Sequence, residues 1–312
     1  MIGIGVNVAA GLPADPGNVV DELVRRARAA EVAGVDTVWL PQGYGFDTLT
    51  TFAAIAREVP RVELGASVVV VQPRHPRVLA AQAQTVQAAS HGRFTLGLGV
   101  SHPGLLEVYG IPFDRPVAAL RAHLDVLSPI LDGRAVPGAE GPGSDAAATA
   151  VPGAVPRVPV LLGALGPVML RLAGERASGT ITFLAGPRTI ADEVVPRLTR
   201  AASGAPRRVV VGVPVAVTDD PGRVRAEVAA EYAAYAQLPS YAATLARDGF
   251  GSPGDIVVAG DEDAVAEGLR RYAEAGATDV NVSLVGDAAD RERTLPVLAQ
   301  LGHAAHSAAS SR

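Results

Sequence analysis

A serine and a histidine follow an apolar, glycine-rich segment in the first third of the chain. The segment Phe94–Val100 contains Gly97 and Gly99 at alternate positions, and Ser101 and His102 come next. Alternate glycines weaken a strand unless another group must approach its backbone closely. A histidine at the end of such a strand can exchange a proton near neutral pH, since its ordinary pKa is about 6.5. This spacing makes His102 a candidate for acid–base chemistry, and a purely structural histidine is the alternative.

Two further segments carry groups that could bind an anion. Gly163–Gly166 and Gly186–Arg188 each lead through a proline into a predicted helix, whose N-terminal amides attract anions. All 27 basic residues are arginines, so only arginine can supply a counter-charge for phosphate, and Arg188 stands in the second turn. The segment Arg74–Pro76 similarly precedes a predicted helix. An ordinary tight turn is the alternative interpretation of each segment.

Composition excludes several classes of chemistry. The 312 residues include neither lysine nor cysteine, which removes Schiff-base mechanisms, thiolate nucleophiles, disulfides and cysteine-ligated metals. The net charge of −5 argues against a nucleic-acid-binding surface. The histidines show no metal-ligand spacing outside the C-terminal tail, so we expect no metal site. The N-terminus resembles a strand rather than a signal peptide and no apolar run could span a membrane, so we expect a cytoplasmic protein without a membrane partner.

Short apolar runs alternate with helical patterns along the chain. The runs are Ile2–Val8, Thr37–Leu40, Glu63–Val71, Phe94–Val100, Val158–Leu162, Thr180–Phe183, Val209–Val217 and Asp279–Leu284. Near-continuous apolar strands are typical of parallel sheets that are covered on both faces, as in a doubly wound sheet or a (β/α)₈ barrel. The number of runs and the chain length favour the α/β fold of the (β/α)₈ TIM barrel.

We predict one domain over residues 1–302, with insertions after strands four and seven. Residues 133–157 contain mainly Gly, Pro, Ala and Ser, which predicts a mobile connection. Residues 219–249 carry three of the six tyrosines and predict added helices. Residues 303–312 are small and polar and predict a frayed tail. In a TIM barrel the loops after the strands carry function, which places the candidate groups on one rim.

Six segments spread along the chain form a recognisable set. They are Ala33–Leu40, Arg74–Pro76, Gly92–His102, Tyr109–Pro116, Ala164–Leu170 and Leu238–Tyr241. Together they resemble the luciferase-like flavin and deazaflavin oxidoreductases, and most closely the actinobacterial branch that depends on coenzyme F420. The likeness covers nearly all of the chain outside residues 133–155 and the tail. It implies a TIM barrel that holds a deazaflavin ring over the C-terminal ends of the strands.

The resemblance implies coenzyme F420 as the cofactor, with FMN as the alternative. It also implies a non-proline cis peptide in a bulge of strand three, and the matching bond is Ser67–Val68. The two glycine turns match regions that hold the cofactor's ribityl phosphate and polar tail. The expected cofactor-binding residues are Gln42, Ser67, Val68, Gly99, Ser101, Gly163, Ala164, Leu165, Gly166, Gly186, Pro187 and Arg188.

The end of strand two departs from the pattern of the deazaflavin sugar-phosphate dehydrogenases in this family. Those enzymes have Asp-His there, whereas this chain has Pro41-Gln42-Gly43-Tyr44. Because a glutamine cannot accept a proton at neutral pH, we expect net reduction of substrate. The resemblance then implies hydride delivery from reduced deazaflavin to an activated C=C or C=N bond of a small organic molecule, as in natural-product biosynthesis. The candidates that would protonate the adjacent atom are His102, Tyr44 and His75.

Two other functions are compatible with the same residues. One is an FMN-dependent luciferase-like monooxygenase, and the other is a flavin-binding relative without catalytic activity. The resemblance further implies a homodimer that acts on a small-molecule substrate and binds no nucleic acid.

Overall fold

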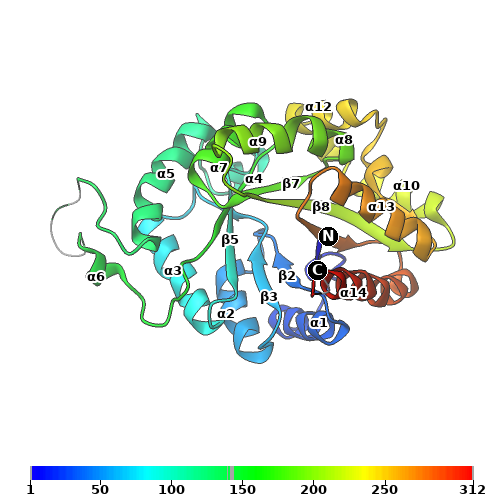
Figure 1. Cartoon of the computed structure of the whole chain (residues 1–312), viewed down its shortest axis with the longest axis horizontal. Coiled ribbons are helices and arrows are strands. Elements are labelled where there is room, and N and C mark those ends of the chain that lie inside the picture. Colours follow the sequence, from blue (N-terminus) through cyan, green and yellow to red (C-terminus); the bar gives the residue numbers. More distant parts are fainter. Residues whose placement is uncertain (1, 139, 141–143, 311–312) are drawn as a thin grey trace.

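Parallel strands close into a barrel (Figure 1), in a computed structural model that describes residues 2–138, 140 and 144–310. The barrel strands are β1 (Gly3–Asn7), β2 (Thr37–Leu40), β3 (Glu63–Ala66) with β4 (Val69–Val70), β5 (Phe94–Gly99), β6 (Val160–Gly163), β7 (Gly179–Phe183), β8 (Arg208–Val217) and β10 (Asp279–Leu284). Both β3 and β4 pair with β5, so they share one of the eight positions in the barrel. Because β10 pairs in parallel with both β1 and β8, the sheet is closed and the predicted TIM barrel is confirmed. A short strand, β9 (Val258–Gly260), extends the far end of β8 outside the ring.

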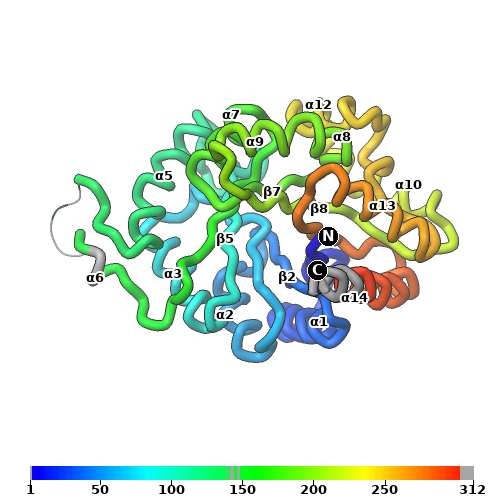
Figure 2. The backbone as a smooth tube through the Cα atoms, in the orientation of Figure 1, coloured from blue at the N-terminus to red at the C-terminus, as the bar shows by residue number. Residues whose placement is uncertain are grey.

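Helices cover the outside of the barrel (Figure 1). Those that follow the barrel strands are α1 (Val19–Ala33), α2 (Thr48–Glu58), α3 (Pro76–Ala89), α5 (Pro116–Leu131), α7 (Pro167–Arg176), α9 (Val195–Ala201), α13 (Glu262–Glu274) and α14 (Ala288–Ser310). Local sequence sets their ends: Asn18 accepts hydrogen bonds from two amides at the start of α1, and Gly34, with φ of 93°, ends that helix. The last helix contacts β1 and α1, and Figure 2 shows it near α1.

The helical segment that follows β7 is interrupted. It consists of α8 (Pro187–Thr189), a π-helical turn η1 (Ile190–Val194) and α9. Pro196, in the first turn of α9, lacks an amide hydrogen and its ring would crowd the carbonyl one turn earlier. The wider π turn immediately before α9 accommodates this proline, which periodicity alone did not reveal.

The two predicted insertions differ in structure. Between β8 and α13 the chain forms α10 (Pro221–Glu231), α11 (Ala233–Ala236), α12 (Pro239–Asp248) and η2 (Pro253–Ile256). The earlier insertion, residues 133–157, contains α6 (Ala146–Thr149), which Figure 1 places away from the barrel; its positions 139 and 141–143 lie outside the described residues. In addition, α14 includes residues 303–310, where composition predicts a frayed tail, and residues 311–312 again lie outside the described part.

A single tryptophan fills the middle of the barrel. Trp39 is fully buried, and a Cβ atom on either Gly5 or Gly65 would lie 2.2 Å from its ring. These two glycines therefore leave the room that the indole occupies. Since Trp39 is the one tryptophan of the chain, its fluorescence reports on the barrel interior. Within the described residues, no helix combines the length and apolar character needed to cross a membrane.

Candidate active site

A bulge interrupts the barrel wall at the point where β3 ends and β4 begins. The Ser67–Val68 bond is a cis peptide there, as the family resemblance predicts. The Val68 side chain faces two glycines: a Cβ on Gly99 would lie 2.5 Å from Val68 Cγ2, and one on Gly163 would lie 3.6 Å from Val68 Cγ1. Ser67 Oγ accepts a 3.0 Å hydrogen bond from Asn281 Nδ2. In the sequence, Gly99 indicates that another group lies close to the backbone of its strand. The Val68 side chain of the bulge is at least part of that group.

The side chain of Gln42 is occupied within its own loop. Its Nε2 donates to two carbonyls of that loop, and its Oε1 accepts from the Thr48 amide at 3.3 Å and from Arg74 at 2.9 Å. Arg74 also bonds Asp47, which caps α2 through the Thr50 amide. Burial raises the pKa of the Asp47 carboxyl, but the bonds from Thr50 and Arg74 lower it on balance. In this arrangement the Gln42 side chain holds the loop together and links it to Arg74.

The two histidines on the rim have different surroundings. His75 is exposed at the N-cap of α3, where its Nδ1 caps the helix by accepting a 3.2 Å hydrogen bond from the Arg77 amide. His102 precedes α4 (Pro103–Val108), makes no capping bond and lies edge-on to Tyr235 with ring centroids 6.1 Å apart. Ser101 between β5 and α4 has φ of 60°, a left-handed conformation that is uncommon outside glycine and clusters at functional sites.

Four aromatic rings meet over the barrel mouth. Phe183, the last residue of β7, makes edge-to-face contacts with Tyr232, Tyr235 and Tyr241 at centroid distances of 5.2, 5.5 and 6.2 Å. Burial raises the pKa of Tyr241 to about 12 and also raises those of Tyr232 and Tyr235, so the phenols keep their protons at neutral pH. Sequence analysis did not place these tyrosines in the site. Their concentration in the second insertion was the available signal.

Two cavities flank the loop that follows β2. The Tyr44 cavity, of about 310 Å³, is lined mainly by Tyr44, Phe46, Val70, Arg74, Leu105 and Tyr109. The Glu231 cavity, of about 280 Å³, lies between α10 and the ends of β1 and β10, and its lining includes Asn7, Pro41, Glu231, Tyr232, Ser283 and Arg291. Cavities of about 550 and 530 Å³ lie on the outer helices, between α5 and α7 and between α2 and α3. Only the first two adjoin the rim where the predicted site residues lie, and Tyr44 itself is 59% exposed.

The glycine turn after β6 leaves the start of α7 uncapped. Gly166 occupies the N-cap position of that helix, and no side chain caps it. A Cβ placed on Gly166 would meet nothing within 4 Å. The neighbouring Ala164 amide donates to the Ile181 carbonyl at 3.1 Å, and Leu165 packs partly against the core. The open part of this turn is therefore Gly166 and the first turn of α7.

The glycine turn after β7 is filled by a carboxylate of the chain itself. Asp248, 8% exposed at the end of α12, accepts hydrogen bonds from the Gly186 amide at 2.9 Å, the Thr189 amide at 3.1 Å and the Thr189 hydroxyl at 2.6 Å. The anion position predicted at Gly186 and Pro187 is thus taken by Asp248. Arg188 beside it is exposed, and no hydrogen bond or ion pair holds its guanidinium among the described residues.

The sequence matches a known family over residues 3–279 of the chain, the luciferase-like monooxygenases. The chain belongs to the luciferase-like monooxygenase family. A Mycobacterium tuberculosis protein named as a coenzyme F420-dependent oxidoreductase is 34% identical over 174 residues, which are 51% of this chain and 50% of that protein. The 5,10-methylenetetrahydromethanopterin reductase of Methanolobus tindarius is 26% identical over 70% of this chain and 67% of that enzyme. A solved F420-dependent secondary alcohol dehydrogenase shares the fold with a TM-score of 0.77 at 15% identity, covering 96% of this chain and 98% of that one.

This luciferase-like chain thus spans about half the length of the first of those relatives. The barrel mouth has some, but not all, of the features expected for a cofactor with a flat ring and an anionic tail. The Val68 bulge and the aromatic cluster offer apolar surfaces on which a flat ring could pack. The uncapped start of α7 and the free Arg188 guanidinium suit a phosphate, whereas the start of α8 does not. In the described part of the chain, no group of three or more His, Cys, Asp or Glu side chains could hold a metal ion.

Proposed function

We propose that this chain is a coenzyme F420-dependent reductase of small organic substrates. The observation that carries the proposal is the Val68 bulge at the barrel mouth, in a chain similar to a relative that is named as a coenzyme F420-dependent oxidoreductase. The position of Gln42 supports the direction of the reaction. Because an amide cannot accept a proton at neutral pH, Gln42 does not supply the base that could draw a proton from an alcohol.

In this proposal, the chain's own residues bind and orient the cofactor. Val68 backs the ring, and the first turn of α7 with Arg188 binds the anionic tail. The coenzyme, when bound, supplies the hydride. Tyr235, Tyr241 and Phe183 exclude water from the mouth and hold the insertion α10–α12 against the barrel.

His102 is our candidate for the group that holds the proton needed in the reduction of a neutral substrate. Replacing it in His102→Ala should lower the turnover number by about 10²–10⁴-fold if it is the general acid. Cofactor affinity should stay close to that of the wild type. His75→Ala is the matched control because that histidine caps α3 and should leave turnover nearly unchanged. Normal turnover in His102→Ala would transfer the role to Tyr44 or to solvent.

The experiment that tests the cofactor assignment is a titration of the purified protein with coenzyme F420 and, separately, with FMN. Binding is measured by the fluorescence of each cofactor and by quenching of Trp39, which lies inside the barrel below the mouth. We expect saturable binding of coenzyme F420 and much weaker binding of FMN. Tighter binding of FMN would contradict the proposal.

An FMN-dependent monooxygenase is the second candidate function, and the name of the matched family favours it. Such an enzyme would bind reduced FMN and consume oxygen in the presence of substrate, which an oxygen electrode measures. A non-catalytic flavin-binding relative is the third candidate. It would bind one of the cofactors and show neither oxygen uptake nor hydride transfer with any substrate in a broad panel of imines and enones.

We also propose that the protein is a homodimer whose interface includes the face of α2 and α3. The cavity of about 530 Å³ between these helices is lined largely by apolar or small side chains, among them Ala53, Ala81 and Val78, and Val78 is 53% exposed. Such an apolar groove is typical of an interaction surface. Light scattering should give twice the chain mass for the wild type and a monomer for Val78→Asp with an unchanged circular dichroism spectrum. A monomeric wild type would contradict this.

A further inference from the structure

The Glu231 cavity lies at the ends of β1 and β10, beside the barrel mouth. The strand ends contribute Asn7 and Ser283, and the helix α10 contributes Glu231. Asn7 Nδ2 donates to Ser283 Oγ at 3.5 Å, and Tyr232 lines the cavity with them. The Tyr232 ring in turn contacts Phe183 of the aromatic cluster at 5.2 Å. A ligand in this cavity would therefore have its inner end at the barrel mouth.

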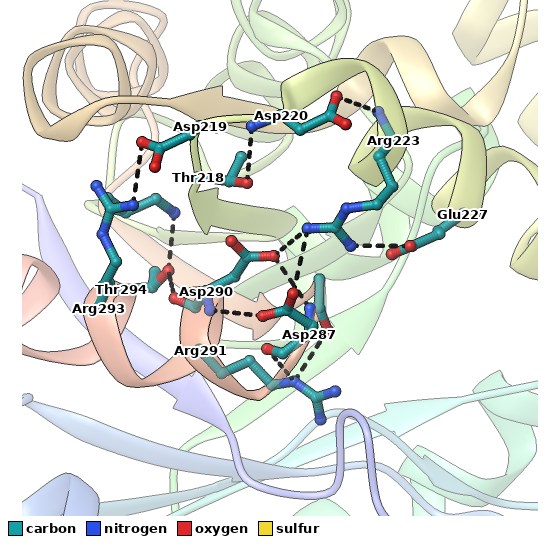
Figure 3. Close-up of polar contacts among 12 residues, drawn as sticks. Thr218, Asp219, Asp220, Arg223, Glu227, Asp287, Asp290, Arg291, Arg293 and Thr294 are labelled. Carbon is teal, nitrogen blue, oxygen red and sulfur yellow. Dashed lines mark hydrogen bonds and ion pairs between the residues drawn. The ribbon is translucent and has the colours of Figure 1, made fainter.

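The arginine side chains at or near the cavity already form hydrogen bonds or ion pairs with other groups of the chain. Arg291 donates from Nε to the Gly286 carbonyl and from Nη1 to the Gly11 carbonyl, each at 3.1 Å, which fixes its guanidinium at the loops after β10 and β1. Arg223 bonds Glu227 at 2.9 Å and Asp290 at 2.5 Å (Figure 3). The charge of Glu227 in the cavity lining is thus compensated by its neighbour on α10.

Glu231 is different, because no hydrogen bond or ion pair holds its carboxylate among the residues that the structure describes. It is the last residue of α10 and lies next to Tyr232. Burial is the main cause that raises the pKa values of Tyr232 and Tyr235, and the Glu231 charge raises both further. A carboxylate that forms no ion pair among the described residues therefore lines the cavity together with the Tyr232 ring.

We propose that the Glu231 cavity binds a cationic nitrogen of the substrate, beside the Glu231 carboxylate and the Tyr232 ring, which both line the cavity. A carboxylate next to aromatic rings favours a cation in two ways, by charge and by the cation–π interaction. The inference rests on the proposed function for its source of hydride. It narrows the substrate class to molecules with a protonated C=N bond, rather than a neutral C=C bond.

Reduction of such a substrate needs no proton donor from the protein. Hydride from reduced deazaflavin adds to the carbon of the protonated C=N bond, and the π electron pair moves to nitrogen, which gives an amine. The reduced deazaflavin becomes oxidised deazaflavin and releases its second hydrogen to solvent as a proton. For this substrate class, turnover would depend on Glu231 and would be less sensitive to loss of His102.

The test compares two probes of nearly equal shape, benzylamine, which is cationic at pH 7.5, and benzyl alcohol, which is neutral. Calorimetric titration of the protein without cofactor should show benzylamine binding about five- to tenfold more tightly than benzyl alcohol. Glu231→Gln should reduce this preference to about twofold or less. The control Glu107→Gln removes another exposed carboxylate on the rim, outside this cavity, and should keep the preference.

Equal binding of both probes to the wild type, no binding of benzylamine, or a preference that survives in Glu231→Gln would each overturn the inference. Added sodium chloride should weaken only the benzylamine interaction, since the charge is partly exposed. The cofactor titration is a separate measurement. A preference for benzylamine in a protein that fails to bind coenzyme F420 would refute the proposed function and leave the cation site in place.

Discussion

The turns after β6 and β7 begin from nearly the same local sequence and end in different states. Both reach Gly-Pro at the start of a helix, and Gly166 and Gly186 have almost the same backbone conformation, with φ of −83° and −82°. At the first turn no side chain caps the helix, whereas at the second the Asp248 carboxylate accepts three hydrogen bonds. One start is open to an external anion and the other already holds an internal one.

Whether the start of a helix can bind an external anion therefore depends on which group of the chain lies opposite it, and not on the residues of the helix start alone. The Asp248 carboxylate is 62 residues away from Gly186 in the sequence and arrives with α12. That contact also fixes α12, which carries Tyr241 of the aromatic cluster, to the start of α8. The second turn therefore anchors the insertion over the mouth, while the first remains available for the cofactor.

Alanine at the two glycines should give the largest contrast. A Cβ on Gly186 would lie 2.5 Å from the Asp248 carboxylate and 2.8 Å from the Phe250 ring, whereas one on Gly166 would meet nothing within 4 Å. We expect Gly186→Ala to lower the free energy of unfolding by about 3–4 kcal/mol, because atoms in a packed region must shift. Gly166→Ala should cost only about 0.5–1 kcal/mol, the loss of a favourable N-cap residue. Urea unfolding of both variants measures the difference, and equal losses would refute the comparison.

Removal of the internal anion should have the next largest effect. In Asp248→Ala the Gly186 amide and the Thr189 amide and hydroxyl lose a buried, charged acceptor, which should cost about 2–3 kcal/mol. Asp248→Asn keeps one acceptor oxygen and should cost about half as much. The exposed Asp263→Ala is the control, with little expected change in the same urea experiment. A loss for Asp248→Ala no larger than for the control would show that the carboxylate does not hold α12 in place.

The barrel and the bulge were predictable because they depend on local patterns. Each strand is an apolar run, and Ser67–Val68 lies at the position in strand three where the family has its bulge. The contacts of the site residues were less predictable, because their partners are far away in the sequence. The sequence around Gly186 does not predict its contact with Asp248, and the sequence around Gln42 does not predict its contact with Arg74. The approach of Tyr235 to His102 depends on how the second insertion folds. The strand ends indicate the rim, but the local sequence does not decide which of its polar groups are free.

Arg188 tests whether the filled turn still contributes to cofactor binding through its side chain. Its guanidinium is exposed and, among the described residues, unpaired, so it can bind the anionic tail although the amides beside it cannot. Arg188→Ala should weaken binding of coenzyme F420 by about ten- to a hundredfold, with a smaller loss at high salt. Arg200→Ala, another exposed arginine at the end of α9, is the control. An unchanged dissociation constant for Arg188→Ala would assign the tail to the turn after β6 alone.

The smallest expected effect comes from making the two turns alike. Asp248→Ala vacates the anion position at α8, so that an external divalent anion can occupy it as the carboxylate did. With sulfate near its dissociation constant, the gain is RT ln 2, about 0.4 kcal/mol, which corresponds to a rise of about 1 °C in the midpoint of thermal unfolding. The measurement compares sodium sulfate with sodium chloride at equal ionic strength, because the general exclusion of sulfate from protein surfaces also stabilises folded chains. That general effect should be the same in the wild type and in Asp248→Ala, so only the excess in the variant reports on the vacated position. No excess would mean that the start of α8 collapses when Asp248 is lost, and that the internal carboxylate shapes the turn as well as filling it.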